Sequence, residues 1–515
     1  MHVNSTPIRT SPSWPPNSTG STEDADRLPL RGRHFRCGDL LIWRRGVVAA
    51  ASHLFRRIAV CVLYRCVVSL AEGVQMMSKV ASSCGAGGSA VGRRQLRSVL
   101  IAATAALCLT GTPAAVGNAD PIPIPQNDPF YTPPSGWEST APGTILNSRP
   151  VEVASMRPEA EDADAWQLLY RTTDNAGRPM TTVTTVLRPR TGQVKGLITY
   201  QVAEDASAPQ CAPSYVLRQG AVPLDHKYDA SLDFLQIDQM LSSGHAISVP
   251  DWEGSNGATI VPKQPGYTAL DGVRAAEAFT PLGLSGTDTP VAAAGYSGGS
   301  LASGWISQLQ PTYAPEVRLV GVARGGGAGG PSEPIGPYLQ SLDGGPFSGF
   351  LLSLLPGMMR ADPRLAAAFD TYLTPAGKAL MAAGDNECSV PLVEKYPFLH
   401  MDDYLTIPFS QVFEQVQAFF DETDYGITAP TVPTFLYHAV NDEIVHIAWV
   451  DQAVANWCAS GAPITYTRDQ MSEHPSLAVA ATAAALRWID DRLAGQPAPD
   501  DCSIRTVPSM ALGGA

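Results

Sequence analysis

The sequence predicts an α/β fold with a mostly parallel, doubly wound sheet and a helical segment inserted in it. Short apolar runs alternate with helix-compatible segments between residues 181 and 322, and such alternation is typical of βαβ units. Several of these runs are apolar almost throughout, which indicates strands covered on both faces. This alternation of strand and helix patterns stops at about Gly325 and resumes near residue 434. Residues 331–425 contain helical patterns without a clear parallel strand, so we expect them to form a helical cap.

Each predicted element follows from its local pattern. Residues 121–142 are rich in proline and polar residues and predict an extended arm. The β-branched alternation in TTVTTVL, residues 181–187, predicts a half-buried strand. Further strands are expected over 196–202, 246–249, 291–294, 317–322, 434–440 and 463–468, with helices over 232–241, 267–279, 300–309 and, as one long helix, 476–493.

The first 119 residues differ in charge from the rest of the chain. They carry 14 Lys+Arg against 5 Asp+Glu, whereas the remainder carries 21 against 43. Such a break indicates a targeting segment joined to an acidic mature protein. Arg93, Arg94 and Arg97 precede an apolar run of 12 residues that is too short to span a membrane. We therefore expect a secretory signal peptide over 93–119, cleavage near Ala119, and a secreted protein.

A signal peptide inside a chain is unusual, because such peptides normally begin it. We expect residues 1–92 to be a basic extension whose first 75 or so residues reflect a wrongly assigned start; the alternative is a genuine extension that contacts membranes or acidic partners. The core would then occupy 120–330 and 426–515, on either side of the cap. The negative charge of the mature part argues against nucleic acid as a partner.

The stretch Gly295-Tyr296-Ser297-Gly298-Gly299 has the G-x-S-x-G spacing of a nucleophile elbow. It stands between a predicted strand and a predicted helix, which is the context that the motif requires. The sharp turn holds the serine hydroxyl at the top of the sheet, beside backbone N–H groups able to bind an oxyanion. The alternative is an ordinary strand end of small residues that enters a helix.

A serine nucleophile needs a general base, usually a histidine oriented by a carboxylate, in the chain order Ser, Asp or Glu, His. Asp442 follows the predicted strand 434–440 and is the candidate acid, and Glu443 is its close rival. An aspartate in such a loop is often only a turn former or a helix N-cap. The order of the residues and their placement in loops favour the catalytic interpretation.

The candidate base is His474, which follows the predicted strand 463–468 through a short loop. Three other histidines follow Ser297 in the sequence, and each has a less suitable place. His400 lies in the predicted cap. His438 lies inside a predicted strand, where a core histidine is expected, and His446 lies at the start of the helix expected after Asp442. The alternative for His474 is a solvent-exposed histidine at a helix start.

Four of the nine cysteines lie in the mature part, and an even number in an exported chain favours disulfides. Cys211, Cys388, Cys458 and Cys502 allow three pairings, and their spacing alone does not choose among them. No Cys-x-x-Cys or His/Cys spacing suggests a structural metal.

Several segments together resemble the secretory lipase family, the lipase A type of α/β-hydrolase with a large helical cap. The resemblance covers about residues 129–502 and rests on YQVAED at 200–205, CAPSY at 211–215, PDWEG at 250–254, GYSGG at 295–299 and HAVNDEIV at 438–445. It implies a secreted serine esterase that acts on acylglycerols, without a metal or cofactor. It also supports the pairings Cys211–Cys388 and Cys458–Cys502, the second of which would tie down the C-terminal tail.

The resemblance implies Ser297 as nucleophile, Asp442 as acid, His474 as base, and an oxyanion hole built with Asp205 and Gly298. The role of Gly298 also follows from the fold, because the residue after the nucleophile donates its N–H there. An ionised Asp205 side chain would repel an oxyanion, so its backbone N–H or a protonated carboxyl must donate. The alternative is that Asp205 merely caps a loop.

The apolar segment 347–359, FSGFLLSLLPGMM, either lines an acyl tunnel or meets a lipid surface, or it forms the core of the cap. The predicted function is hydrolysis of acylglycerol esters, with possible contact between the cap and a lipid–water interface. The alternatives are a cell-envelope acyltransferase, a short-chain esterase, a peptidase, or a catalytically silent lipid-binding envelope protein.

Overall fold

The computed structural model describes residues 122–154, 162–221, 231–327, 335–421 and 428–512. They belong to one compact unit, 117–515. The predicted basic extension, the signal peptide and its cleavage site lie outside the described residues. In the described part of the chain, no helix combines the length and the apolar character needed to cross a membrane.

A ten-stranded sheet with the order β1-β2-β3-β5-β4-β6-β7-β8-β9-β10 forms the core. The pairs β1–β2, β2–β3 and β3–β5 are antiparallel and all the other pairs are parallel, so the predicted α/β-hydrolase sheet is confirmed. The strands are β1 (Ile145–Val151), β2 (Ala163–Thr173), β3 (Pro179–Pro189), β4 (Leu197–Gln201), β5 (Ala246–Pro250), β6 (Val291–Tyr296), β7 (Leu319–Gly325), β8 (Thr434–Ala439), β9 (Ile464–Asp469) and β10 (Ser503–Val507).

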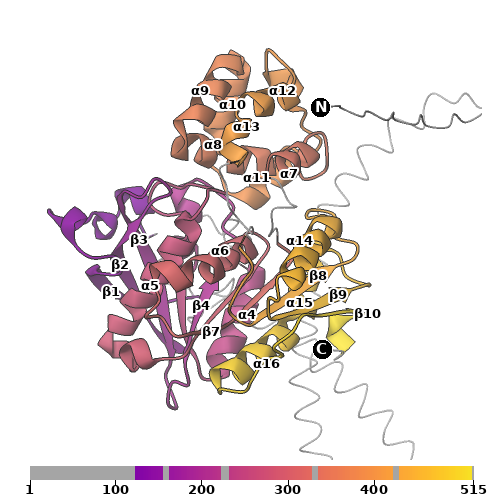
Figure 1. Ribbon diagram of the computed structural model, residues 1–515. Coiled ribbons are helices and arrows are strands. Elements are labelled where there is room, and N and C mark those ends of the chain that lie inside the picture. The colour runs from indigo at the N-terminus through magenta and orange to yellow at the C-terminus, as the bar shows by residue number, and fades with distance from the viewer. Residues whose placement is uncertain (1–121, 155–161, 222–230, 328–334, 422–427, 513–515) are drawn as a thin grey trace, which may run out of the picture. The chain divides into compact units, whose positions relative to one another are not determined.

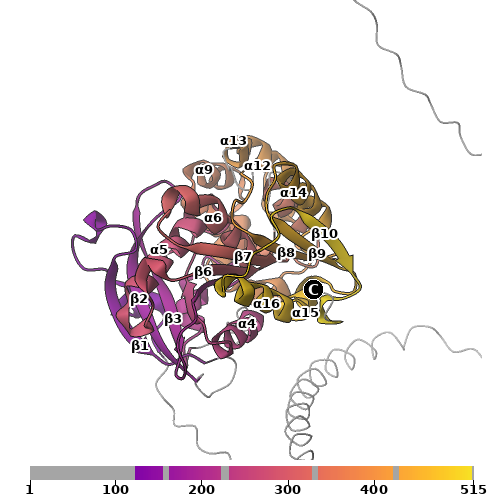
Figure 2. The same ribbon diagram turned by 60° about the horizontal axis from the view of Figure 1, so that its bottom comes forward.

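Helices cover both faces of the sheet, as Figure 2 shows. Side chains of adjacent strand residues point to opposite faces. Leu197 belongs to the buried cluster that also holds side chains of α5 and α6, and Ile198 belongs to the cluster of the opposite face, with side chains of α4, α15 and α16. Burial on both faces explains why β4, β5 and β6 are apolar in nearly every position. The core helices are α3 (Pro213–Val216), α4 (Ser231–Ser242), α5 (Gln264–Ala278), α6 (Gly298–Tyr313), α14 (Ile447–Ala459), α15 (His474–Ala480) and α16 (Thr482–Leu493).

A second group of helices lies between β7 and β8 in the chain and forms the cap, drawn in orange in Figure 1. Asp362 and Thr374 cap two of them by accepting hydrogen bonds from Arg364 N and Gly377 N, as N-cap side chains do. The apolar segment forms α8, whose side chains from Leu351 to Met358 are buried in the cap. The cap helices are α7 (Ile335–Leu342), α8 (Phe350–Ala361), α9 (Pro363–Tyr372), α10 (Pro375–Gly384), α11 (Ser389–Lys395), α12 (Phe409–Gln415) and α13 (Gln417–Asp421).

The structure corrects two predicted elements. β3 is buried on both faces rather than on one, and two of its threonine hydroxyls find partners there: Thr182 donates to Asp251 O at 2.8 Å and Thr184 pairs with Ser248 at 2.8 Å. The predicted single helix over 476–493 is two helices, α15 and α16, separated at Ala481. The Thr482 hydroxyl donates to Ala478 O at 2.7 Å, and such back-bonding often bends helices.

Two disulfides join distant parts of the chain. Cys211–Cys388 links the segment after β4 to the cap, and Cys458–Cys502 links α14 to the segment that enters β10. Both expected pairings are therefore present.

Candidate active site

Ser297 stands between the end of β6 and the start of α6, in the sharp turn that the motif predicts. Its φ of 54° lies in the left-handed region, which costs a non-glycine residue free energy and is frequent at active sites. The chain passes so closely that a Cβ on Gly295 would lie 2.3 Å from Gly299 O, and one on Gly299 would lie 1.9 Å from Gln201 O. These two glycines therefore allow the turn to form against the neighbouring strand.

Three loops at the carboxyl ends of β6, β8 and β9 bring Ser297, Asp442 and His474 together. The imidazole Nε2 of His474 lies 2.9 Å from the hydroxyl of Ser297. Its Nδ1 lies 2.8 Å and 3.0 Å from the two carboxylate oxygens of Asp442. The histidine and the aspartate are only 5% and 6% exposed, so the chain shields these two side chains from water, whereas Ser297 is partly exposed.

Asp442 is held in place by its own loop. Its Oδ1 accepts from Ile444 N at 3.1 Å and from Val445 N at 2.7 Å. Burial pushes the pKa of Asp442 up, but the hydrogen bond and charge of His474 outweigh it, and the pKa is lowered. Asp442 is therefore ionised at neutral pH and can stabilise an imidazolium at His474.

The rival candidates hold other positions, two of them within the same site. Glu443 accepts from the backbone N–H of His474 at 2.9 Å through its carboxylate, so it holds the backbone rather than the ring. His438 is fully buried in β8, as expected of a core histidine, and its Nε2 lies 2.8 Å from Val445 O and 3.3 Å from Oδ2 of Asp442. His400 is 61% exposed in the cap, and His446 is the N-cap of α14.

Helix α15 begins two residues earlier than predicted, at His474 itself. Glu473 is its N-cap and forms a capping box with Ser476, which satisfies two backbone N–H groups at the helix start. The box fixes the direction in which the chain leaves β9 and thus the position of the histidine.

Asp205 and Gly298 lie against each other. A Cβ on Gly298 would lie 2.0 Å from Oδ1 of Asp205, so only glycine leaves room for this carboxyl. Asp205 has a φ of 45°, a second strained residue at the same edge of the sheet. Burial raises its pKa to about 6, and the charge of His474 opposes that shift.

Tyr296 is a residue of this site that the sequence did not single out. Its hydroxyl donates to the backbone carbonyl of His474 at 2.6 Å, and the two rings lie 5.3 Å apart. It occupies the variable position before the serine in the motif. A tyrosine there has an aromatic ring and a hydroxyl that seeks a partner when buried, and this was the only feature of the sequence that could have indicated its role.

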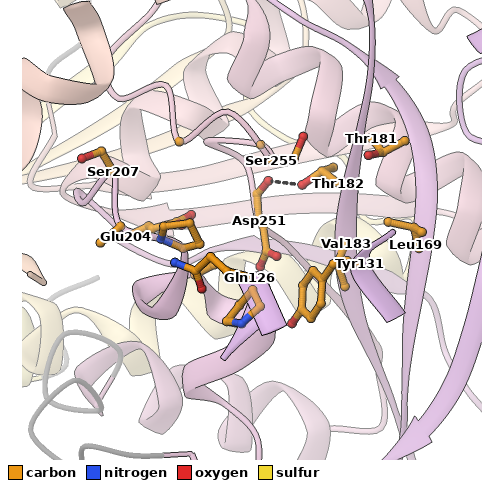
Figure 3. A pocket seen from close by; sticks show the side chains of 16 residues that line it. Gln126, Tyr131, Leu169, Thr181, Thr182, Val183, Glu204, Ser207, Asp251 and Ser255 are labelled. Atoms are coloured by element: carbon orange, nitrogen blue, oxygen red, sulfur yellow. Dashed lines mark hydrogen bonds between the residues drawn. The ribbon is translucent and has the colours of Figure 1, made fainter. Parts of the chain in front are cut away.

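Buried acids surround the loop that carries Asp205. Burial raises the pKa of Asp251 to about 7, and it raises the pKa values of Glu204 and Glu253 well above their usual range. Figure 3 shows Glu204 and Asp251 at a cavity of about 160 Å³ that Tyr131 also lines. In the described part of the chain, no group of three or more His, Cys, Asp or Glu residues is arranged to hold a metal ion.

A family model described as secretory lipase matches residues 224–501, more than half of the chain. The chain belongs to the secretory lipase family. This secretory lipase is 36% identical to a probable inactive lipase of Mycobacterium tuberculosis over 75% of this chain and 86% of that one. It is 34% identical to a secreted triacylglycerol lipase of Malassezia globosa, over 74% and 84% of the respective chains.

The crystal structure of Candida antarctica lipase A in its closed state has the same fold as this secretory lipase. The TM-score is 0.65 at 31% identity, over 73% of this chain and 88% of that one. Family membership places the chain among the carboxylic ester hydrolases.

Proposed function

We propose that this secretory lipase is secreted and hydrolyses carboxylic esters of acylglycerols through a triad of Ser297, His474 and Asp442. The observation that carries the proposal is the unbroken series from serine oxygen to imidazole to carboxylate, with distances of 2.9 Å and 2.8 Å. The lowered pKa of Asp442 adds to it, because a charged carboxylate favours the tautomer with the proton on Nδ1. Nε2 is then free to accept the serine proton.

The reaction has two steps that mirror each other. Ser297 Oγ attacks the ester carbonyl carbon while Nε2 of His474 takes the hydroxyl proton. The tetrahedral intermediate collapses, the alcohol leaves with that proton, and the acyl group stays on Ser297. Water then attacks the acyl-enzyme, again giving its proton to His474, and the carboxylic acid leaves as Ser297 recovers its proton.

The negative oxygen of each intermediate would be held by the backbone N–H of Gly298 and by Asp205. The N–H of Gly298 lies at the start of α6, where unpaired N–H groups and the helix dipole favour negative charge. At pH values below about 6, Asp205 is largely protonated and its carboxyl can also donate. Loss of one such donor typically costs about 10²–10³ in rate.

Part of the contact with lipid esters would be made by the cap. Phe398, in the cap segment between α11 and α12, is 64% exposed and has a φ of 60°. A bulky residue in that backbone region is strained, and an exposed aromatic ring suits contact with a lipid–water interface. We infer that this part of the cap contacts the surface of lipid substrates.

The relative named inactive favours one alternative, a catalytically silent lipid-binding protein. A fluorophosphonate probe on the purified full chain separates the two, because it reacts only with an activated serine. We expect labelling that is lost in Ser297→Ala and kept in Ser460→Ala, whose hydroxyl is exposed on α14's C-cap. Absence of labelling in the wild type would refute the triad.

The products distinguish hydrolysis from acyl transfer. Triacylglycerols of short and long chain, with and without an acceptor alcohol, should release free fatty acid, and the release should stop in Ser297→Ala. Transfer of the acyl group to the acceptor alcohol, giving a new ester with little free fatty acid, would instead identify an acyltransferase. Hydrolysis of soluble short esters alone would identify a short-chain esterase.

A further inference from the structure

The segment that follows Asp205 is bonded to the cap at three points. Ser207 Oγ donates to Asp385 Oδ1 at 2.7 Å, and Gln210 Nε2 donates to Asn386 O at 2.9 Å. Cys211 and Cys388 form a disulfide. Residues 205–211, which we call the oxyanion segment, therefore run alongside cap residues 385–388, which follow α10.

Arg360, at the end of α8, completes the junction. Its guanidinium pairs with Asp385 and donates to Asn256 O at 2.7 Å, and it lies 3.5 Å from Ser207 O. The chain is closely packed here, since a Cβ on Gly257 would lie 2.4 Å from Ser207 O and 2.7 Å from the guanidinium. Two cap residues thus enclose Ser207, which is 1% exposed.

The core holds the other end of the same stretch. Trp252 Nε1 donates to Val202 O at 2.6 Å, and Gln201 O contacts the elbow at Gly299. Asp205 therefore lies between an anchor in the core at Val202 and an anchor in the cap at Ser207. Figure 3 shows Ser207 and Glu204 on this stretch beside the cavity. Because the backbone of Asp205 is in a strained region, its conformation depends on such flanking contacts.

We propose that Asp385 and Arg360 are positioning residues that act through Ser207 to hold Asp205 against Gly298. The cap then assembles part of the oxyanion hole. This inference rests on the proposed function of the site. Ser207 is two residues from Asp205, at most about 7 Å along the chain. A displacement of the backbone at Ser207 therefore also displaces Asp205. Misplacement by about 1 Å can cost about 10²-fold in rate.

The junction is suited to positioning rather than to stability. The Arg360 and Asp385 side chains are 37% and 36% exposed, and ion pairs so exposed contribute little to folding stability. The nearby disulfide keeps the cap attached when the ion pair is removed. Loss of Asp385 should therefore change the rate of the chemical step more than it changes the melting temperature or substrate binding.

Variants of one cap residue test this on the full chain. Asp385→Ala should lower kcat for a soluble short-chain p-nitrophenyl ester about 10-fold to 100-fold, with KM within about twofold of wild type, because only the transition state gains from the oxyanion hole. Asp385→Asn keeps an acceptor oxygen for Ser207 and should recover most of kcat. The control is Asp370→Ala, which removes an exposed cap carboxylate paired with Lys378 at 3.6 Å.

A double-variant cycle tests whether the effect passes through Ser207. Ser207→Ala should resemble Asp385→Ala, and the pair together should be no slower than the slower single variant, since residues in one hydrogen-bonded unit are not additive. If the kcat losses of the two single variants multiply in the double variant, Asp385 acts independently of Ser207, and the proposal is overturned. So would a kcat of Asp385→Ala within twofold of wild type.

Amide hydrogen exchange gives a readout independent of activity. In Asp385→Ala, a peptide that covers 202–208 should exchange faster, while a peptide that covers 291–299 and the Asp370→Ala control should not change. Should the wild type fail to hydrolyse any ester, the proposed function fails, yet the exchange still decides whether the cap holds this segment. Unchanged exchange at 202–208 would refute the junction itself.

Discussion

The hydroxyl of Tyr296 donates a hydrogen bond of 2.6 Å to the backbone carbonyl of His474. The residue immediately before the proposed nucleophile thus fixes the start of the helix that carries the proposed base. This hydrogen bond joins two chain segments separated by 178 residues. The Ser297–His474 distance consequently depends on a residue that takes no part in proton transfer.

Tyr296→Phe removes this hydrogen bond and keeps the ring. A hydrogen bond of this kind contributes about 1 kcal/mol, so we expect kcat to fall by roughly fivefold and KM to stay near wild type. Steady-state kinetics on a soluble ester, with the melting temperature recorded alongside, measure both. A matched control is Tyr338→Phe in α7, and equal losses in the two variants would contradict a specific role for Tyr296.

Asp442→Asn should be far slower than Glu443→Gln. The amide at 442 no longer favours the reactive tautomer of His474, and in a well-studied serine protease the corresponding change costs about 10⁴ in kcat. Glu443 accepts from the backbone N–H of His474 rather than from its ring, so Glu443→Gln should cost about tenfold or less. The reverse order in kcat would assign the acid to Glu443.

The stability of the fold should decline from acidic to neutral pH. Asp251 has a folded pKa of about 7, and Glu204 and Glu253 are shifted in the same direction by burial. A carboxyl whose folded pKa is raised binds its proton more tightly in the folded state. It stabilises the fold fully below the unfolded pKa of about 4, and this contribution is lost as pH rises toward 7.

Glu253→Gln removes one of these groups while keeping its shape. The melting temperature of the wild type should fall between about pH 4 and pH 7, and the variant should show a shallower fall. Thermal unfolding measured at one-unit pH steps is sufficient. The exposed Glu394→Gln serves as control, and an identical slope in all three proteins would argue against buried, protonated acids.

The two disulfides should differ in their effect on stability. Cys211–Cys388 closes a loop of 177 residues and Cys458–Cys502 a loop of 44. In the chain-entropy account, removing the first should cost about 1 kcal/mol more than removing the second. Chemical unfolding of the two double Cys→Ser variants compares them, and a larger loss from the shorter loop would show that native contacts outweigh loop length.

Phe398→Ser should separate surface contact from chemistry. We expect slower hydrolysis of a long-chain triacylglycerol emulsion and an unchanged rate on a soluble short ester, because only the emulsion presents an interface. The cap residue Tyr404→Ser serves as the matched aromatic control. Equal rates of wild type and Phe398→Ser on the emulsion would remove Phe398 from the lipid-contacting surface.

Local patterns in the sequence were sufficient for most of the core. The apolar runs that became β4, β5 and β6 are buried on both faces, so their composition carried a clear signal. The elbow at Ser297 and the loops of Asp442 and His474 were recognisable because their chemistry depends on spacing and order. β1, β2 and β10 were missed. Most residues of β1 and β10 are at least partly exposed, and both strands lie at the margins of the sheet. β2 is largely buried, but charged and polar residues such as Asp164, Gln167 and Arg171 interrupt its apolar pattern.

The remaining contacts depend on segments far apart in the chain. Nothing near Asp385 in the sequence indicates Ser207, which lies 178 residues away. The hydrogen bond of Tyr296 and the packing of Asp205 on Gly298 likewise arise only once strands and cap are assembled. Such contacts leave no periodic pattern, so sequence alone could name the candidate catalytic groups but not the residues that hold them.

The covalent bond between Cys211 and Cys388 restricts how a substrate can gain access to Ser297. The cap cannot lift away from the core as one rigid lid, because one of its corners is fixed to the chain that leads from β4. A movement of the cap that admits a long acyl chain must pivot about the Cys211–Cys388 bond, or it must take place among cap helices remote from that bond. Reducing agents would release this hinge point, and they should change substrate entry and the stability of the fold at the same time.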